Sequence, residues 1–264
     1  MKYTFGTSTA AAARLEEIAR YFNPLASSLV KEYAPDSPDV AVDIGCGPGF
    51  TTDMLCRSAQ ARETYGLDNS ADFLALAESR FSNCRFLKHD ITTIPFPVQA
   101  DVMYGRFILS HLQNPANVIR KWATQLTVGG VLLVDELEAI DTDVDLFKQY
   151  LSMNDALIAT QGANLFVGRE LTGQDYGAKT LLDDCAILPV LDSQAAKWFL
   201  PNTETIWRQD PFILGRLTLS EIESISNALR RLADSDDPQS HIVWKMRRIA
   251  LRRNGSLRPA SGKH

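Results

Sequence analysis

The chain has 264 residues, of which 45% are hydrophobic and 22% are charged, and this balance suits one large α/β domain or two small ones. Its formal net charge of −5 argues against DNA or structured RNA as the main partner, because non-specific nucleic-acid binders carry a basic excess. The first residues lack the apolar core of a signal peptide, and no stretch approaches the roughly 20 apolar residues of a membrane-spanning helix, so we expect no membrane contact.

Short β-branched segments alternate with helical segments through the first half of the chain. A helix is expected at 10–33, where an apolar stripe includes Phe22 and Pro24 should kink or split the helix. Further helices are expected at 50–59, after an N-capping Ser70, and after Asn114-Pro115, the last ending at Gly129-Gly130. Strands are expected at 40–44, 63–67, 85–88, 100–104 and 131–135. This alternation predicts βαβ units and a doubly wound parallel sheet.

The alternation ends after residue 138. We expect a helix at 141–163, an irregular segment at 164–177, a helix at about 174–184 and a strand within 186–199. Ser220 and Glu223 fit a capping box ahead of an amphipathic helix. The β-rich segment 241–251 predicts a last strand, and the basic tail 252–264 should be loosely held.

The four cysteines do not form a recognisable framework. Their positions show neither the closely spaced cysteine pairs that are typical of zinc sites nor the regular spacing of disulfide-rich domains; the four are Cys46, Cys56, Cys84 and Cys185. We therefore expect reduced thiols, a cytoplasmic protein and the absence of a metal site.

The most informative segment is a strand that runs directly into the glycine-rich sequence DIGCGPG at 43–49. Closely spaced glycines between a strand and a helix let a ligand approach the backbone. Dinucleotide enzymes also carry such a loop, but their GxGxxG fingerprint needs a third glycine where this chain has Phe50. Here the glycines fall as GxGxG, with Asp43 two residues before the first, so a dinucleotide site and a turn that binds nothing are the weaker interpretations.

The sequence VDIGCGPG at 42–49 resembles the first motif of class I S-adenosylmethionine-dependent methyltransferases, of the type that modifies small molecules. The resemblance covers 39–138 and extends weakly to the first helix and the last strand. It implies a Rossmann-like α/β fold with a mostly parallel seven-stranded sheet, an N-terminal helix and a lid-like insertion after the fifth strand. It also implies S-adenosyl-L-methionine as cofactor and S-adenosyl-L-homocysteine as product.

On this basis we expect a single domain, 1–264, with four parts. These are a helical cap at 1–38, a cofactor-binding core at 39–138, a substrate or lid region at 139–212, and a C-terminal part at 213–264. The substrate should be selected by the first helix and by the aromatic-rich stretch 141–212, because long segments near a site often act as lids.

The resemblance implies cofactor contacts at the ends of the first two strands. Gly45, Cys46 and Gly47 would lie against the methionine portion. Asp68 would accept both ribose hydroxyls, and Asn69 would line the adenosine pocket. A helix-capping role is the alternative for Asp68. If Asp68 binds the ribose, its carboxylate should lack a partner in the protein without cofactor. Replacing Asp68 would then change the stability of the cofactor-free protein little.

Four further residues are implied as contacts. Asp90 would accept the adenine amino group, and Ile91 would pack on the ring; an exposed turn acid is the alternative for Asp90. Arg106 would contact the methionine end, or else form a surface ion pair. Tyr3 would close over the cofactor's carboxylate, with a frayed terminus as the alternative.

His111 is the candidate acid or base, because it follows the fourth strand on the cofactor face and a histidine side chain ordinarily titrates near neutral pH. A packed or capping histidine is the competing interpretation. In-line methyl transfer needs mainly position and desolvation, so a dedicated base is not required.

Three functions remain open from the sequence. The first is methylation of a small molecule, most commonly at oxygen, in secondary metabolism, by a monomer or homodimer. The second is an RNA methyltransferase, which the acidic charge opposes; Tyr104-Gly105-Arg106-Phe107 also stands where base methylation would place an Asn-Pro-Pro-Tyr motif. The third is a protein that binds S-adenosylmethionine without transferring its methyl group, as a regulator or a cofactor-assisted cyclase or isomerase.

Overall fold

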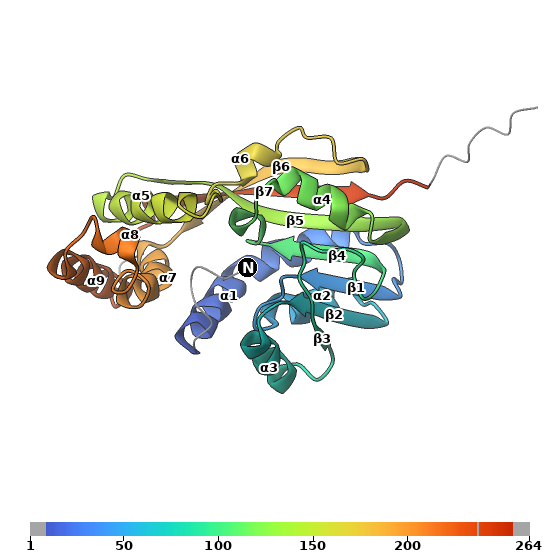
Figure 1. The fold of residues 1–264 in the computed structure, drawn as a ribbon, viewed down its shortest axis with the longest axis horizontal. Coiled ribbons are helices and arrows are strands. Elements are labelled where there is room, and N and C mark those ends of the chain that lie inside the picture. Colours follow the sequence, from blue (N-terminus) through green and yellow to red (C-terminus); the bar gives the residue numbers. More distant parts are fainter. Residues whose placement is uncertain (1–8, 237, 256–264) are drawn as a thin grey trace, which may run out of the picture.

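A seven-stranded sheet in the order β3-β2-β1-β4-β5-β7-β6 forms the centre of the molecule (Figure 1). The structure is a computed structural model and describes residues 9–236 and 238–255. The strands from β3 to β5 run parallel, whereas β7 is antiparallel to both β5 and β6. Their bounds are β1 Val40–Ile44, β2 Glu63–Asp68, β3 Arg85–Lys88, β4 Ala100–Arg106, β5 Leu126–Thr142, β6 Lys179–Val190 and β7 Ile242–Arg252. The α/β, mostly parallel fold predicted from the sequence is confirmed.

Helices cover both faces of the parallel part, which is why its central strands read as continuous apolar runs. On one face lie α1 (Thr9–Tyr33), α2 (Phe50–Ala59) and α3 (Ala71–Arg80), which pack on alternate residues of β1 to β5. On the other face lie α4 (Pro115–Ala123) and α6 (Gly168–Leu171), packed around the buried Trp122. The carboxyl ends of β1, β2 and β4 therefore meet at one edge of the sheet, the edge at which open α/β sheets bind ligands.

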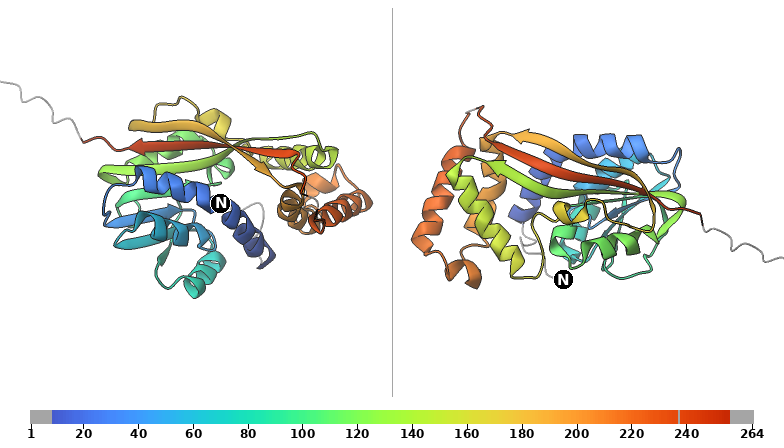
Figure 2. Two further views of the ribbon diagram at one scale, coloured as in Figure 1. Left: turned by 180° about the vertical axis from the view of Figure 1, so that it is seen from behind. Right: turned by 90° about the horizontal axis from the view of Figure 1, so that it is seen from above.

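A group of helices from the second half of the chain, distinct from the N-terminal cap expected at 1–38 and called the helical cap from here on, stands beyond that edge (Figures 1 and 2). It consists of α5 Asp145–Ala159, α7 Asp192–Glu204, α8 Pro211–Leu214 and α9 Leu219–Ala233. The long strands β5, β6 and β7 extend past the parallel strands to reach it. Its core is aromatic: the Tyr150 ring stacks on Phe199 at 4.1 Å between centroids and on Trp207 at 5.4 Å. Such rings bury large apolar areas and hold the cap against the sheet.

In the first half of the chain the predicted elements are largely confirmed. The helix at 50–59 and the strand at 85–88 have the expected bounds, and the Ser70 hydroxyl accepts the expected cap bond from the Phe73 amide. Helix α1 continues through Pro24 without a break. Asn114 does not cap α4 with its side chain; it takes a left-handed φ of 52° ahead of Pro115. The glycine pair at 129–130 lies inside β5, so it does not end that helix.

The prediction for 174–199 was wrong, because helix and strand occur there in the reverse order. Residues 179–190 form β6, an edge strand paired with β7, and α7 follows it. Two acids of this segment are held in the strand by ion pairs, Asp183 with Arg247 at 2.9 Å and Asp184 with Arg248 at 2.6 Å. These partners lie about 60 residues away in sequence, so local patterns could not reveal them.

Two smaller predictions also need correction. The helix expected from residue 141 begins at Asp145, because β5 stays paired with β7 as far as Thr142. The capping box of α9 is formed by Thr218 and Glu221, two residues before the predicted pair. The expected boundary at 138/139 therefore falls inside β5.

In residues 9–236 and 238–255, no helix combines the length and apolar character that crossing a membrane requires.

Candidate functional site

A cavity of about 690 Å³, partly open to solvent, lies where β1, β2 and β4 end and where α1 passes over them. We call it the cofactor cavity. Five of the residues predicted as cofactor contacts line it: Gly45, Cys46, Gly47, Asp68 and Arg106. The lining also includes residues that were not predicted as cofactor contacts: Leu15, Ile18, Ala19, Pro48, Phe50, Thr51, Ser70, Phe73, Phe107 and Ile108.

The glycines of the loop serve two different purposes. Gly47 has a left-handed φ of 51°, and a Cβ there would meet nothing closer than Leu15 and Phe73 at 4.0 Å, so the backbone faces open space. Gly49, with φ 88°, lies against α3, where a Cβ would come within 2.9 Å of Ala77 and Phe81. The third glycine of the GxGxG pattern thus permits close approach of a helix, whereas Gly47 leaves room for a ligand.

Asp43 is buried beneath this loop and shapes it. Its Oδ2 accepts hydrogen bonds from the hydroxyls of Thr51 at 2.6 Å and Thr52 at 2.7 Å, which join the end of β1 to the first turn of α2. Burial raises the pKa of Asp43 to about 6, although the two hydroxyls and the charge of Arg106 favour its ionised form. The acid before the first glycine therefore fixes the loop and is not part of the cavity wall.

Asp68 joins the loop to the next strand. Its Oδ2 accepts the Gly47 amide at 2.9 Å and its Oδ1 accepts the Ser70 amide at 2.8 Å. The expectation that this carboxylate lacks a partner in the free protein was therefore wrong. A carboxylate has about four acceptor positions, so two backbone bonds leave capacity for a ligand's hydroxyls. Burial raises the pKa of Asp68, and the backbone bonds oppose that shift.

Arg106 is 8% exposed at the end of β4 and lines the same cavity. Its Nη2 donates to Oδ1 of Asn23 at 2.9 Å, but its buried Nη1 has no hydrogen-bond partner among the described residues. Within the same part of the chain it forms no ion pair, so the surface ion pair considered from the sequence is not seen. An unsatisfied buried guanidinium nitrogen is costly, and an anionic ligand group would satisfy it.

Three of the remaining predicted contacts, Asn69, Asp90 and Ile91, lie outside the described lining of the cavity. Asn69 is exposed, and the Asp90 carboxylate accepts both the amide and the hydroxyl of Thr92, which lowers its pKa. Ile91 is partly buried and packs against the core, and its carbonyl accepts the Trp122 indole N–H at 2.8 Å. Tyr3 lies outside the described residues. The roles of these four residues stay predictions.

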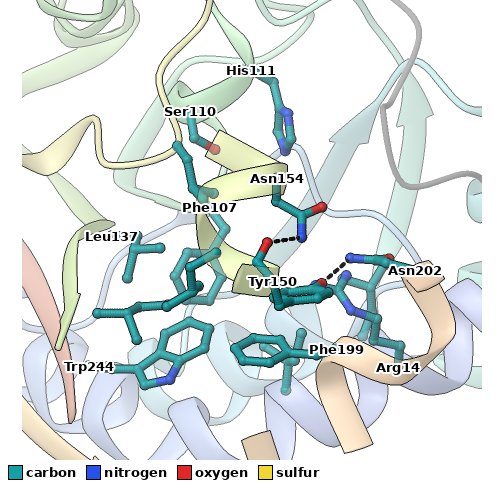
Figure 3. A pocket seen from close by; sticks show the side chains of 15 residues that line it. Arg14, Phe107, Ser110, His111, Leu137, Tyr150, Asn154, Phe199, Asn202 and Trp244 are labelled. Atoms are coloured by element: carbon teal, nitrogen blue, oxygen red, sulfur yellow. Dashed lines mark hydrogen bonds between the residues drawn. The ribbon is translucent and has the colours of Figure 1, made fainter. Parts of the chain in front are cut away.

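A second cavity, which we call the substrate cavity, adjoins the first. It encloses about 670 Å³, partly open to solvent, between α1, the loop after β4, β5 and the helical cap. Leu15, Ile18 and Phe107 line both cavities, so these side chains form a shared wall. Most of its surface is apolar or aromatic, with a few polar groups from Arg14, Ser110, His111, Asn154 and Asn202 (Figure 3). No spacing pattern in the sequence relates these residues.

His111, the candidate base, lies on the wall of the substrate cavity. Burial lowers its pKa to about 4, and the positive charge of Arg14 acts in the same direction. The ring is therefore neutral at pH 7.

Nowhere in the described part of the chain do three His, Cys, Asp or Glu side chains gather as metal ligands could.

Glu136, which sequence reasoning missed, holds the loop that carries the shared wall. It is fully buried on β5, and its Oε1 accepts the amides of Ile108 and Leu109, both at 2.7 Å. The adjoining Phe107 has a φ of 56°, a left-handed conformation that non-glycine residues rarely adopt. Burial raises the pKa of Glu136 to about 8 despite these two bonds. The carboxyl group thus stabilises a strained turn between the two cavities.

The sequence matches known methyltransferases over its central part. Residues 42–134 match the family described as "Methyltransferase domain". A trans-aconitate 2-methyltransferase from Rhodopseudomonas palustris is 31% identical over 116 residues, which are 44% of this chain and 45% of that protein. The chain spans about half the length of the curated relatives it matches.

Solved methyltransferase structures share the fold over a longer stretch. A putative methyltransferase from Bacillus halodurans superposes with a TM-score of 0.55 at 12% identity, covering 87% of this chain and 99% of that one. Coclaurine N-methyltransferase, bound to N-methylheliamine and S-adenosylhomocysteine, gives 0.54 at 15% identity, covering 88% and 72%. Residues 42–134 therefore match a methyltransferase domain, in agreement with the resemblance of the glycine loop, and the strand order and the superpositions show a fold shared with these methyltransferases.

Proposed function

We propose that this protein transfers the methyl group of S-adenosylmethionine to an oxygen atom of a small molecule held in the substrate cavity. The observation that carries the proposal is the shared wall: Leu15, Ile18 and Phe107 line both the cofactor cavity and the substrate cavity. Two cavities separated by single side chains allow two ligands to be held in contact, and such positioning is the main protein contribution to methyl transfer.

The residues of the cofactor cavity fit S-adenosylmethionine. Gly47 leaves space at the backbone, Asp68 can accept ribose hydroxyls, and Arg106 offers an unsatisfied buried N–H to a carboxylate. The cofactor would supply a methyl group bonded to a positively charged sulfur. The chain's own contribution is to orient the two ligands and to exclude water with the aromatic and aliphatic side chains between them.

His111 is poorly suited to remove a proton from an alcohol or a phenol. A phenol with a pKa near 10 lies about six pKa units above this imidazole, so proton transfer would cost roughly 8 kcal/mol. An acceptor oxygen that is already ionised at neutral pH needs no base. We therefore assign His111 to the wall of the substrate cavity, where its neutral ring contacts the substrate.

The substrate named for the Rhodopseudomonas relative is not carried over to this chain. The family match ends at residue 134, and only Phe107, Ser110 and His111 among the described lining residues of the substrate cavity fall within it. Trans-aconitate bears three carboxylates, whereas the described lining holds one cation, Arg14. Uncompensated buried charges cost several kcal/mol each, which disfavours a tricarboxylate here.

The proposal is tested by incubating the protein with S-adenosylmethionine and a panel of carboxylic acids, phenols and amines. Mass spectrometry would follow S-adenosylhomocysteine and any product heavier by one methylene. We expect both to form in equal amounts with at least one oxygen acceptor. Binding of the cofactor without any methylated product across the panel would instead support a protein that binds S-adenosylmethionine without transferring its methyl group.

Replacing Asp68 with Ala should affect the protein in two ways. Loss of a charged acceptor for ribose hydroxyls is expected to weaken S-adenosylhomocysteine binding by roughly 10- to 100-fold in calorimetry. The free protein should also lose about 1–3 kcal/mol of unfolding free energy, because the Gly47 and Ser70 amides lose their acceptor. Asp90→Ala is the matched variant and tests the predicted adenine contact. Reduced stability with unchanged affinity would show that Asp68 serves the loop alone.

A further inference from the structure

A single turn after β4 contributes side chains to both cavities. Phe107 belongs to the shared wall, Ile108 lines the cofactor cavity, and Ser110 lines the substrate cavity. Two sets of contacts fix this turn. Glu136 accepts hydrogen bonds from two of its backbone amides, and the Ile108 side chain packs so closely on the glycine loop that a Cβ on Gly45 would overlap with it. Ser110 therefore has a fixed position relative to the cofactor cavity.

The hydroxyl of Ser110 is placed to bind a ligand. The residue is 6% exposed, and in the view of Figure 3 its oxygen points into the space between Phe107 and Asn154. Within residues 9–236 and 238–255, this hydroxyl makes no hydrogen bond. A hydroxyl has one hydrogen to donate and two lone pairs, so the group can bind an oxygen atom of a substrate.

Three other polar side chains of the cavity wall hold helices together. Arg14 Nε of α1 donates to the Trp198 carbonyl of α7 at 2.7 Å. The Nδ2 atoms of Asn154 and Asn202 donate to the carbonyl and the hydroxyl of Tyr150, at 2.9 Å and 2.6 Å. These bonds join α1 to α7 and α7 to α5 around the cavity. The turn beside the shared wall is therefore where a hydrogen bond to the reacting end of a substrate fits best.

The body of the cavity is apolar and aromatic. Phe107 lies edge-on to Trp244 at 6.4 Å between ring centroids, and Phe199 stacks on Trp244 at the same distance. Such faces favour a flat aromatic body, which gains free energy in proportion to the area it buries. The described lining includes no Asp or Glu, so it offers no counter-ion to an ammonium group and no carboxylate that would repel a negatively charged oxygen.

We infer that the substrate is an acidic phenol and that the Ser110 hydroxyl donates a hydrogen bond to its ionised acceptor oxygen. The inference rests on the proposed function, because it names the substrate class of the same site. Burial in an apolar cavity disfavours a charged oxygen, and a hydrogen bond donated to that oxygen offsets the cost. An ionised oxygen supplies the electron pair of the new O–C bond and releases no proton, while the pair of the broken S–C bond stays on sulfur. No base is then required, which agrees with a neutral His111.

Two probes of the same shape test the inference through binding. 4-Nitrophenol ionises near neutral pH, whereas 4-nitrotoluene carries a methyl group in place of the hydroxyl. Calorimetric titrations of the full chain at pH 8 are made with and without S-adenosylhomocysteine. We expect 4-nitrophenol to bind about tenfold or more tightly than 4-nitrotoluene. Equal affinity for the two probes, or no binding of 4-nitrophenol, would overturn the inference.

Three variants separate recognition from packing. Ser110→Ala is expected to lose about tenfold or more in affinity for 4-nitrophenol and to bind 4-nitrotoluene within about twofold of the unchanged protein. Ser110→Thr keeps the hydroxyl and should keep the preference for 4-nitrophenol. Ser152→Ala is the control, because Ser152 is exposed on α5. An equal loss of both probes in Ser110→Ala would show that the serine only shapes the cavity.

The absorption spectrum of bound 4-nitrophenol gives a second measurement, because the ionised form absorbs in the visible range. The bound probe should ionise about one pH unit lower in the unchanged protein than in Ser110→Ala, since a tenfold stronger hold on the ionised form corresponds to about one unit. A serine with a purely structural role would not shift this ionisation. The same midpoint in both proteins would contradict a hydrogen bond to the ionised oxygen.

The two proposals fail in different ways. Binding of S-adenosylhomocysteine without any preference for 4-nitrophenol would refute the role of Ser110 and leave methyl transfer standing. A preference for 4-nitrophenol that depends on Ser110, in a protein that does not bind S-adenosylhomocysteine, would support the Ser110 site and refute the proposed activity.

Discussion

Replacing Arg106 with Met is expected to weaken S-adenosylhomocysteine binding by roughly 100-fold, or about 3 kcal/mol. The buried Nη1 of Arg106 has no partner among the described residues, and the side chain lines the cofactor cavity. Without the guanidinium, the amino-acid carboxylate of the ligand would be buried near Asp43 and Asp68 with no cation to offset them. Isothermal titration of the two proteins measures the difference directly.

A truncated ligand supplies the control for this variant. 5′-Methylthioadenosine keeps the adenosine and the sulfur but lacks the amino-acid portion. Arg106→Met should bind it as the unchanged protein does, within about twofold, whereas Asp68→Ala should bind both ligands more weakly. If Arg106→Met weakens both ligands equally, the residue supports the shape of the cavity and does not recognise the carboxylate.

The stability of the free protein should fall as pH rises from about 5 to 8, and Glu136 should account for the largest part. Its pKa is about 8 in the folded protein against an ordinary value of 4.5. The folded protein therefore keeps a proton that the unfolded chain has lost. This contribution is fully present below pH 4.5, declines as pH rises, and is lost above pH 8. Asp43, with a pKa of about 6 raised from 3.8, acts in the same direction over a lower range.

Glu136→Gln isolates the effect, because glutamine does not titrate and still offers an oxygen to the Ile108 and Leu109 amides. Denaturant unfolding at pH 6 and pH 8 should show that the unchanged protein loses about 2 kcal/mol more than the variant between these pH values. Glu78→Gln, on the exposed side of α3, should follow the unchanged protein. Parallel curves for the unchanged protein and Glu136→Gln would contradict a buried, protonated Glu136.

The parallel half of the fold could be predicted because its signals are local. Residues 40–44 are an apolar, β-branched run that stops at glycines, and residues 50–59 follow as a helix, so pattern and structure agree. That Gly47, Asp68 and Arg106 line one cavity follows from the same logic, because parallel strands bring their carboxyl ends to one edge. Their roles as cofactor contacts were implied by the resemblance and stay predictions. The motif at residues 42–49 then indicated a resemblance to the S-adenosylmethionine-dependent methyltransferases.

The antiparallel half could not be predicted, because distant partners determine it. Residues 179–190 become a strand through pairing with β7 and through the ion pairs of Asp183 and Asp184. The substrate cavity joins Arg14 of α1 to Asn202 of α7, which lie far apart in the sequence. Glu136 carried no sequence signal either, because an acid within an apolar strand shows its role only when the loop amides that it binds are known.

The most direct measurement of the central claim is a crystal structure of the protein with S-adenosylhomocysteine. We expect the ribose hydroxyls on the Asp68 carboxylate, the amino-acid carboxylate on Arg106, and the sulfur facing the wall formed by Leu15, Ile18 and Phe107. That arrangement would direct the methyl group of the cofactor into the substrate cavity. A ligand bound elsewhere, or one whose sulfur faces away from that wall, would contradict methyl transfer between the two cavities.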